Sequence, residues 1–376
     1  MSKIFTQALS ASLKEHTNLS ETRQETLGWL VILIVRLGTV CLWRMAAHVE
    51  SPVLTASTER RLRRFFQHVR FDEALIARLV VRLMGLGNKP WELALDRTNW
   101  KFGRCEINIL MLGIVHNGVC VPLLWSLLPK AGNSNAGERI DLMSRMRKIF
   151  PDQSILRITG DREFIGNAWI GWLAENGVPF VLRLKDNMHI WNEDHVPVPL
   201  SRLAQGLKKG LKKGQHLILK GHWHLGKNRN PHDPAARIVI LRLKTGELLI
   251  LFTSGRPHAA LAQYRKRWQI ETLFSCLKKR GLGLEDTHMT NPEKLSTLIA
   301  VLAIAFCFAF KAGLWAARSK PAPVKKHGFP ARATFAMGLD VLRKFFAAAN
   351  ITQTKNLIRS LTAQKIPRKP LPVNLF

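Results

Sequence analysis

The chain has 376 residues, of which 57 are Lys or Arg and 26 are Asp or Glu, so its formal net charge is +31. A charge of that size attracts polyanions, which makes DNA or RNA the expected partner and an acidic membrane surface the competing one. With 47% hydrophobic residues the chain is no disordered basic tail. Its five scattered cysteines, without a Cys-x-x-Cys pair, argue against a disulfide framework and against structural zinc.

Two apolar stretches, residues 27–35 and 297–310, test the membrane alternative. The first is followed by Arg36 and the second stops at Lys311. Both are shorter than the about 20 apolar residues that a spanning helix needs, so we predict that they are buried core helices. The N-terminus lacks a charged segment followed by a cleavable apolar one. We therefore expect a soluble cytoplasmic protein without a membrane partner.

Changes in composition divide the chain into regions. Residues 1–88 are predicted to be a helical DNA-binding region, in which residues 58–66 form a basic helix that contacts phosphates or is simply solvated. Residues 317–376 are predicted to be a basic C-terminal region, with a helix near residues 334–348 and a tail that ends in Pro367-Arg-Lys-Pro370. Between them lie the two parts of a core, at 89–187 and 259–316, and a β-rich insertion at 188–258.

The region after residue 88 has the pattern of an α/β layered core. Strands are predicted at residues 91–96, 107–115 and 119–125, and the tight turn Asn117-Gly118 joins the last two. A helix, a strand, a helix and a strand follow, at residues 138–150, 154–160, 164–176 and 180–184. The insertion is predicted to hold strands at residues 215–220, 236–243 and 247–253, and a mobile basic turn at residues 206–214.

Residues 264–278 are predicted to form a single helix, because no Gly or Pro interrupts them. At about 100° per residue, Tyr264, Arg267, Glu271 and Lys278 share one face. The neighbouring face is apolar and consists of Ile270, Leu273, Phe274 and Leu277. A lone carboxylate between two cations and the single tyrosine of the chain suits a site that holds divalent metal and phosphate. The simplest alternative is an exposed Arg267–Glu271 ion pair.

Two further acids, Asp96 and Asp161, each close a predicted strand and precede a polar turn. Either one alone is explained as a turn former or a helix cap. Together with Glu271 they make three carboxylates, a set that can hold two divalent ions and activate water at a phosphodiester.

Three motifs in this order resemble the DDE transposases of bacterial insertion sequences. They are Asp96-Arg-Thr-Asn-Trp100, Gly160-Asp-Arg-Glu-Phe164 and Tyr264-x2-Arg267-x3-Glu271-x6-Lys278. The last pattern is the hallmark of the group named after insertion sequence four. The resemblance covers residues 90 to 315 and implies a ribonuclease-H-like catalytic core with a β-rich insertion, flanked by helical N- and C-terminal regions.

The resemblance also implies an activity. Asp96, Asp161 and Glu271 would be catalytic metal ligands for Mg²⁺, for which Mn²⁺ can substitute. The enzyme would cut double-stranded DNA at the terminal inverted repeats of its element, pass through a hairpin, and join the ends to target DNA. A homodimer is expected in the synaptic complex.

The DNA-binding residues implied by the resemblance lie close to these acids in sequence. Tyr264, Arg267 and Lys278 would grip the phosphates beside the cleavage point. Arg162 would be a further cation there, or pair with a local acid. Trp268 would stack on a base or pack against the core. Relatives also carry a stacking tryptophan on the strand before this helix, which the present sequence lacks at residues 248–254.

Two other classes of protein stay open. In a tyrosine recombinase Tyr264 would be the nucleophile, but such a nucleophile follows its Arg and His partners, whereas Tyr264 precedes Arg267. A non-catalytic DNA-binding regulator would account for the +31 charge but not for three acids in these motifs.

Overall fold

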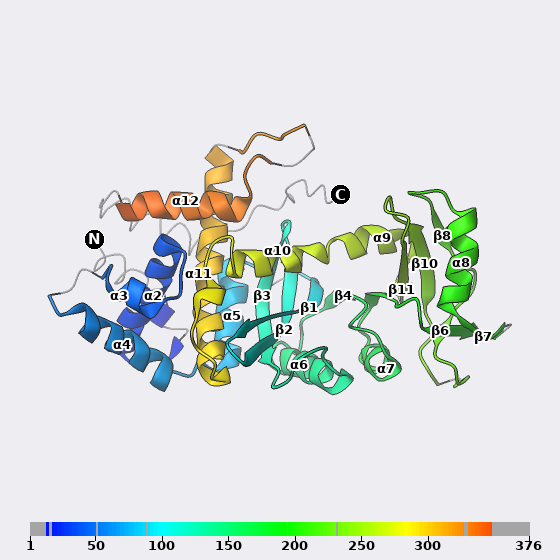
Figure 1. The fold of residues 1–376 in the computed structure, drawn as a ribbon, viewed down its shortest axis with the longest axis horizontal. Helices are drawn as coiled ribbons and strands as arrows, with labels where there is room; N and C mark the ends of the chain where they lie inside the picture. The colour runs from blue at the N-terminus through cyan, green and yellow to red at the C-terminus, as the bar shows by residue number, and fades with distance from the viewer. Residues whose placement is uncertain are drawn as a thin grey trace.

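A computed structural model describes most of the chain. The described residues are 13–14, 17–49, 52–87, 89–193, 195–230, 232–319, 321–326 and 330–347. The predicted basic tail at residues 367–370 lies outside them. Figure 1 shows an elongated molecule, with a helical part at one end, a central sheet and a second β-rich part at the other end.

The centre is an eight-stranded sheet in the order β3-β2-β1-β4-β5-β11-β10-β8. Its first five strands are β1 (Trp91–Phe102), β2 (Cys105–His116), β3 (Val119–Leu127), β4 (Ile155–Gly160) and β5 (Phe180–Arg183). The first three are antiparallel, and β4 and β5 run parallel to β1. The helices α6 (Ala136–Ile149) and α7 (Asn167–Glu175) lead into β4 and β5. The predicted order of elements and the α/β class are therefore confirmed.

Two details of β1–β3 bear on the site. The Asn117-Gly118 turn is confirmed, since both residues have positive φ, 50° and 81°, as a tight hairpin turn requires. The predicted end of the first strand at Asp96 is wrong, because β1 continues to Phe102 and pairs with β2 along its whole length. Residues 97–102 are mostly polar, so their strand character depends on this pairing and not on an apolar pattern.

The insertion is built largely onto the same sheet. Its strands β8 (His216–Ile218), β10 (Arg237–Arg242) and β11 (Leu248–Thr253) continue the sheet because β11 pairs antiparallel with β5. A small separate sheet contains β6 (His189–Asn192), β7 (His195–Pro199) and β9 (His224–Leu225). The predicted mobile turn is wrong for residues 206–210, which belong to α8 (Leu200–Gly210). Leu203 and Leu207 pack that helix against the core.

The helical part contains α2 (Glu21–Leu37), α3 (Leu42–Ala46), α4 (Thr55–His68) and α5 (Glu73–Met84), together with α12 (Thr334–Ala347). The long helix α11 (Pro292–Ser319) lies between these helices and the sheet (Figure 1). In the described chain α11 is the one helix long and apolar enough to cross a membrane, and its apolar window is wholly buried inside the protein. Both apolar stretches are thus core helices, as predicted, although α11 is longer than expected.

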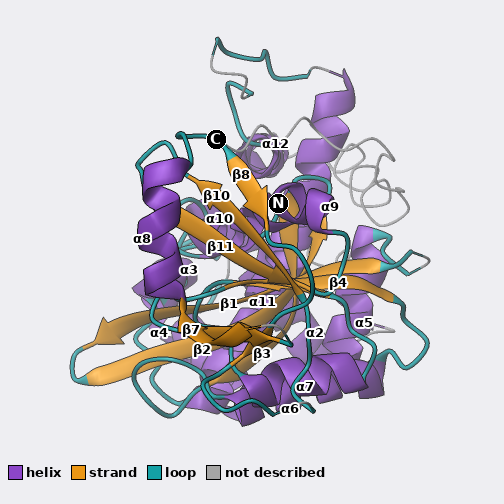
Figure 2. Ribbon diagram, turned by 90° about the vertical axis from the view of Figure 1, so that its right-hand side faces the viewer, coloured by secondary structure: helices purple, strands orange, loops and turns teal. Residues whose placement is uncertain are grey.

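The predicted helix over residues 264–278 is two helices. These are α9 (Pro257–Arg265) and α10 (Trp268–Leu277), which lie nearly in line across one side of the sheet, while α6 and α7 lie on the other (Figures 1 and 2). At the junction the N–H groups of Lys266 and Arg267 donate to carbonyls three residues back, at 3.1 and 2.9 Å. This tighter 3₁₀ pattern separates the helices without Gly or Pro, so the sequence does not mark it. The apolar face of α10 is buried as predicted.

Candidate active site

The topology brings Asp96 and Asp161 to neighbouring positions. In the parallel pairing of β1 with β4, Leu95 lies opposite Gly160. Asp96 and Asp161 directly follow these two residues and therefore lie at neighbouring positions. The β4 strand ends there, and Asp161 begins the turn that leads to α7. A hydrogen bond from Phe164 N–H to the Asp161 carbonyl, at 2.8 Å, closes this turn.

The third acid, Glu271, is linked to Asp96 by Arg267. The guanidinium of Arg267 donates from Nη1 to Asp96 Oδ2 at 3.2 Å and from Nη2 to Glu271 Oε1 at 2.7 Å. Arg267 is only 7% exposed, and its Nε has no hydrogen-bond partner in the described part of the chain. The alternative of an exposed Arg267–Glu271 ion pair is therefore wrong, because Arg267 is buried and links the two carboxylates.

Tyr264 completes the group from the end of α9. Its hydroxyl donates to Asp161 Oδ1 at 3.5 Å, and the guanidinium of Arg267 lies 5.5 Å from the centre of its ring. Burial raises the pKa of Tyr264 to about 12. The hydroxyl therefore stays a protonated donor at neutral pH, which suits a role in binding better than one as a nucleophile.

Negative charge is concentrated at this site. Burial raises the pKa of Asp96 to about 6 although Arg267 opposes it, and the charges of Glu271 and Asp161 act in the same direction as burial. One arginine thus compensates the three carboxylates only in part. Such a set of oxygen ligands suits a hard divalent cation. In the structure the Arg267 guanidinium lies between two of these carboxylates, Asp96 and Glu271. In the arrangement seen, no three acidic, His or Cys side chains among the described residues form a metal site.

The remaining predicted DNA-binding residues are less closely joined to this group. Lys278, at the end of α10, pairs with Glu285 at 2.9 Å, donates to the Asn99 carbonyl at 3.2 Å and is 14% exposed. Arg162 is exposed and pairs with no acid among the described residues, so the alternative of a local ion pair is not seen. Trp268 is 39% exposed, and its ring centre lies 5.9 Å from the guanidinium of Arg267.

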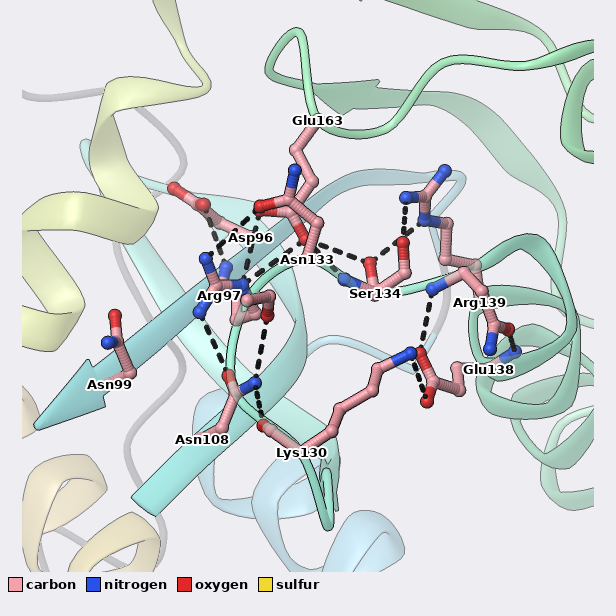
Figure 3. Close-up of polar contacts among 12 residues, drawn as sticks. Asp96, Arg97, Asn99, Asn108, Lys130, Asn133, Ser134, Glu138, Arg139 and Glu163 are labelled. Carbon is pink, nitrogen blue, oxygen red and sulfur yellow. Dashed lines mark hydrogen bonds and ion pairs between the residues drawn. The ribbon is translucent and has the colours of Figure 1, made fainter. Parts of the chain in front are cut away.

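A polar network on the opposite side of β1 was not predicted. Figure 3 shows Glu163, Asn108 and Asn133 around the guanidinium of Arg97. Glu163 also accepts from the N–H of Ser134 at 2.8 Å. Arg97 and Glu163 lie within the motifs that pointed to Asp96 and Asp161, so the only available signal was their place beside those acids.

Comparison with known proteins gives a family match. The profile of a family described as "Transposase DDE domain" matches residues 89–308, more than half of the chain and a span that includes all three acids. No curated protein sequence matches the chain. Among solved structures, the chain is similar to the cryo-EM structure of the piggyBac transposase synaptic complex with hairpin DNA. The TM-score is 0.46 and the identity 14%, over 98% of this chain and 83% of that one.

Proposed function

The chain belongs to the transposase DDE domain family, and from this premise we propose that it is the transposase of an insertion sequence of the group named after insertion sequence four. It would cut DNA at the ends of its element and join them to target DNA in the bacterial cytoplasm. The observation that carries the proposal is the meeting of Asp96, Asp161 and Glu271 around Arg267 and Tyr264. The strand order β3-β2-β1-β4-β5 with α6 and α7 supports a ribonuclease-H-like core.

The proposed cofactor is Mg²⁺, with Mn²⁺ as a substitute, held by Asp96, Asp161 and Glu271. Transposases of this family generally use divalent metals. When bound, two such ions activate water and stabilise the attacking and leaving oxygens at a phosphodiester. The partial burial of Asp96 strengthens its electrostatic interactions by excluding water.

Arg267 and Tyr264 would bind the phosphates beside the cleavage point. The planar fork of Arg267 now spans two carboxylates, and the same fork matches two phosphate oxygens. Its Nε is buried and has no hydrogen-bond partner within the described residues, so the donors of Arg267 are not all used by the protein. Lys278, Arg162 and Trp268 would extend this contact along the DNA, and Trp268 is exposed enough to stack on a base.

The proposed reaction has four steps. Hydrolysis of one strand at the element's end leaves a 3′ hydroxyl. That hydroxyl attacks the phosphodiester of the opposite strand, which closes a hairpin on the element's end and releases the flanking DNA. Hydrolysis of the hairpin restores the 3′ hydroxyl, which then attacks a target phosphodiester. No covalent link between protein and DNA forms in this sequence of steps.

The N-terminal helices would supply phosphate contacts away from the acids. A hollow of about 550 Å³ between α2 and α4 is lined by Arg23, Arg60, Arg61 and Arg64, and no acid is among its lining residues. We expect Arg60→Gln to lower the salt dependence of DNA binding by about one unit of slope. Arg63→Gln is the control on the same helix, because Arg63 is paired with Glu59 at 2.7 Å and lines no part of this hollow. Equal slopes of the salt dependence in both variants would argue against phosphate binding in this hollow.

The decisive experiment is cleavage of DNA that carries the element's own end. The purified protein should cut it with Mg²⁺, and Asp161→Asn should not. A denaturing gel should show the hairpin as a strand of double length. Cleavage in excess EDTA or a trapped phosphotyrosyl adduct at Tyr264 would select a tyrosine recombinase instead. Metal-independent binding of the correct end without any cleavage would select a regulator. A dimer is expected in the complex that holds two ends.

A further inference from the structure

We propose that Arg97 and Glu163 are positioning residues, whose ion pair on the far side of β1 holds the carboxylates of Asp96 and Asp161 in their place. The proposal rests on the proposed function, because it concerns the same metal-binding acids. It assigns a task to two residues that do not themselves face those acids.

The first observation is the alternation of side chains along β1. Asp96 and Arg97 are successive residues of this strand, so their side chains point to opposite sides of the sheet. The carboxylate of Asp96 meets Arg267, at the start of α10, whereas the guanidinium of Arg97 meets Glu163. Figure 3 shows this second side, where Arg97 points into a group of polar residues from separate segments.

The second observation is the quality of the ion pair. Arg97 Nε donates to both carboxylate oxygens of Glu163, at 3.3 and 3.2 Å, and both side chains are only 14% exposed. Glu163 also accepts from the N–H and the hydroxyl of Ser134, at 2.8 and 3.0 Å. Arg97 Nη1 donates to Asn108 Oδ1 at 3.0 Å. The pair therefore joins β1, β2, the turn after β4 and the segment before α6.

The third observation links this pair to the acids through the backbone. The N–H of Arg97 donates to Asp96 Oδ1 at 2.7 Å, and the N–H of Arg162 donates to Asp161 Oδ1 at 2.6 Å. Each aspartate thus has one oxygen oriented by the next peptide group. Because Arg97 and Glu163 hold these two backbone segments, their ion pair controls where both carboxylates point.

The turn that carries Asp161 is also tight. A Cβ atom on Gly160 would lie 2.8 Å from Cβ of Phe164, so the turn accepts no side chain at this position. Such a turn has little room to adjust if Glu163 loses its partner. We expect the change to reach Asp161, two residues away, and not to be absorbed between them.

The test measures Mn²⁺ binding to the full chain without DNA, by calorimetry or by the free-Mn²⁺ electron paramagnetic resonance signal. Glu163→Gln and Arg97→Gln should each weaken Mn²⁺ binding by roughly 10- to 100-fold, the usual effect of losing a group that orients metal ligands. The rate constant kcat for cleavage should fall while KM for DNA stays unchanged. The double variant should bind Mn²⁺ no more weakly than the single variant of lower affinity, because each change removes the same ion pair.

Arg157→Gln is the matched control. Arg157 pairs with Glu92 across the same strands, β1 and β4, and the two side chains are 15% and 17% exposed. Glu92 keeps a second partner, Lys266, in this variant. We expect Arg157→Gln to leave Mn²⁺ affinity and kcat unchanged, although it too breaks a partly buried ion pair.

Unchanged Mn²⁺ affinity in folded Arg97→Gln and Glu163→Gln would overturn the inference and leave the pair a purely structural one. If either variant fails to fold, Glu163→Asp decides the question: its shorter side chain keeps the charge, and Mn²⁺ binding should weaken by a few-fold, whereas wild-type affinity would reject the inference. Failure of the proposed function looks different, since the wild-type protein itself would then neither bind Mn²⁺ nor cut its element's end.

Discussion

The two sides of strand β1 differ sharply at adjacent residues. On one side Asp96 faces Arg267, in a site where burial raises the pKa of Asp96 to about 6 and one guanidinium nitrogen lacks a partner among the described residues. On the other side every nitrogen of the Arg97 guanidinium donates to a side-chain oxygen. The first side is electrostatically incomplete, which fits the proposed binding of cations and phosphate there, and the second is complete.

The difference indicates a division of labour between neighbouring residues. A buried charge without a partner lowers the stability of the folded state, and proteins retain such charges at sites that bind ligands. A satisfied polar network instead fixes one arrangement of its members. If this contrast is correct, changes on the Asp96 side should affect chemistry more than stability, and changes on the Arg97 side should act through geometry.

The largest effect is expected from Asp96→Asn. Loss of this carboxylate should reduce single-turnover cleavage of the element's end by about 1,000-fold, which corresponds to roughly 4 kcal/mol of transition-state stabilisation. The variant should still bind end DNA in a gel-shift assay, because the arginines remain. A rate within tenfold of the wild type would remove Asp96 from the catalytic group.

The next effect concerns pH and the metal-free protein. The pKa of Asp96 rises from 3.8 to about 6 on folding, mainly through burial, so the folded state holds this proton more tightly than the unfolded chain. The contribution of Asp96 protonation to the free energy of unfolding is therefore lost as the pH rises from about 4 to above 6. The loss amounts to up to about 3 kcal/mol. In urea unfolding, the free energy of unfolding of Asp96→Asn should increase relative to that of the wild type as the pH rises across this window. A constant difference between the two proteins at all pH values would contradict the burial of this charge.

A smaller effect is expected from Arg267→Lys. A single ammonium group cannot reproduce the fork that reaches Asp96 and Glu271 together, so cleavage should fall by roughly 10- to 100-fold. The measurement is the cleavage rate at saturating DNA, with Arg265→Lys as the control on the neighbouring helix turn. A wild-type rate in Arg267→Lys would show that any positive charge suffices here.

The smallest effect is expected from Asn133→Ala, at the exposed edge of the Arg97 network. Asn133 accepts one long hydrogen bond from Arg97, at 3.4 Å. Its loss should cost about 0.5 kcal/mol of unfolding free energy in a urea titration and leave cleavage unchanged. A loss of activity would mean that the network tolerates no missing member, and the contrast between the two sides would then be weaker.

Local patterns were sufficient for much of the fold. The strand and helix order from β1 to β5 follows from periodicity, and the Asn117-Gly118 turn follows from the ease with which these residues adopt positive φ. Features that depend on distant partners were missed. The polar end of β1 is a strand because β2 pairs with it, and β11 joins the core sheet because β5 offers its edge.

The candidate site shows the same limit. The motifs pointed to Asp96, Asp161 and Glu271, and two of them lie at neighbouring positions because β1 and β4 are parallel and in register. The burial of Arg267 between two carboxylates could not be read from an i,i+4 spacing, which is equally typical of an exposed ion pair. Glu163 gave no signal of its own, since its partners Arg97 and Ser134 are distant in sequence.

The sequence by itself determined the basic charge, the α/β class and the motifs that propose Asp96, Asp161 and Glu271 as the acids of the site, because each depends on residue type and short-range spacing. Only the tertiary structure decided which charges are buried, where the predicted helix over residues 264–278 divides, and which residues lie around Asp96 and Asp161. Burial and hydrogen bonding depend on what surrounds a group in space. The ion pair of Arg97 and Glu163 therefore forms only after β1, β4 and the turn between β4 and α7 come together.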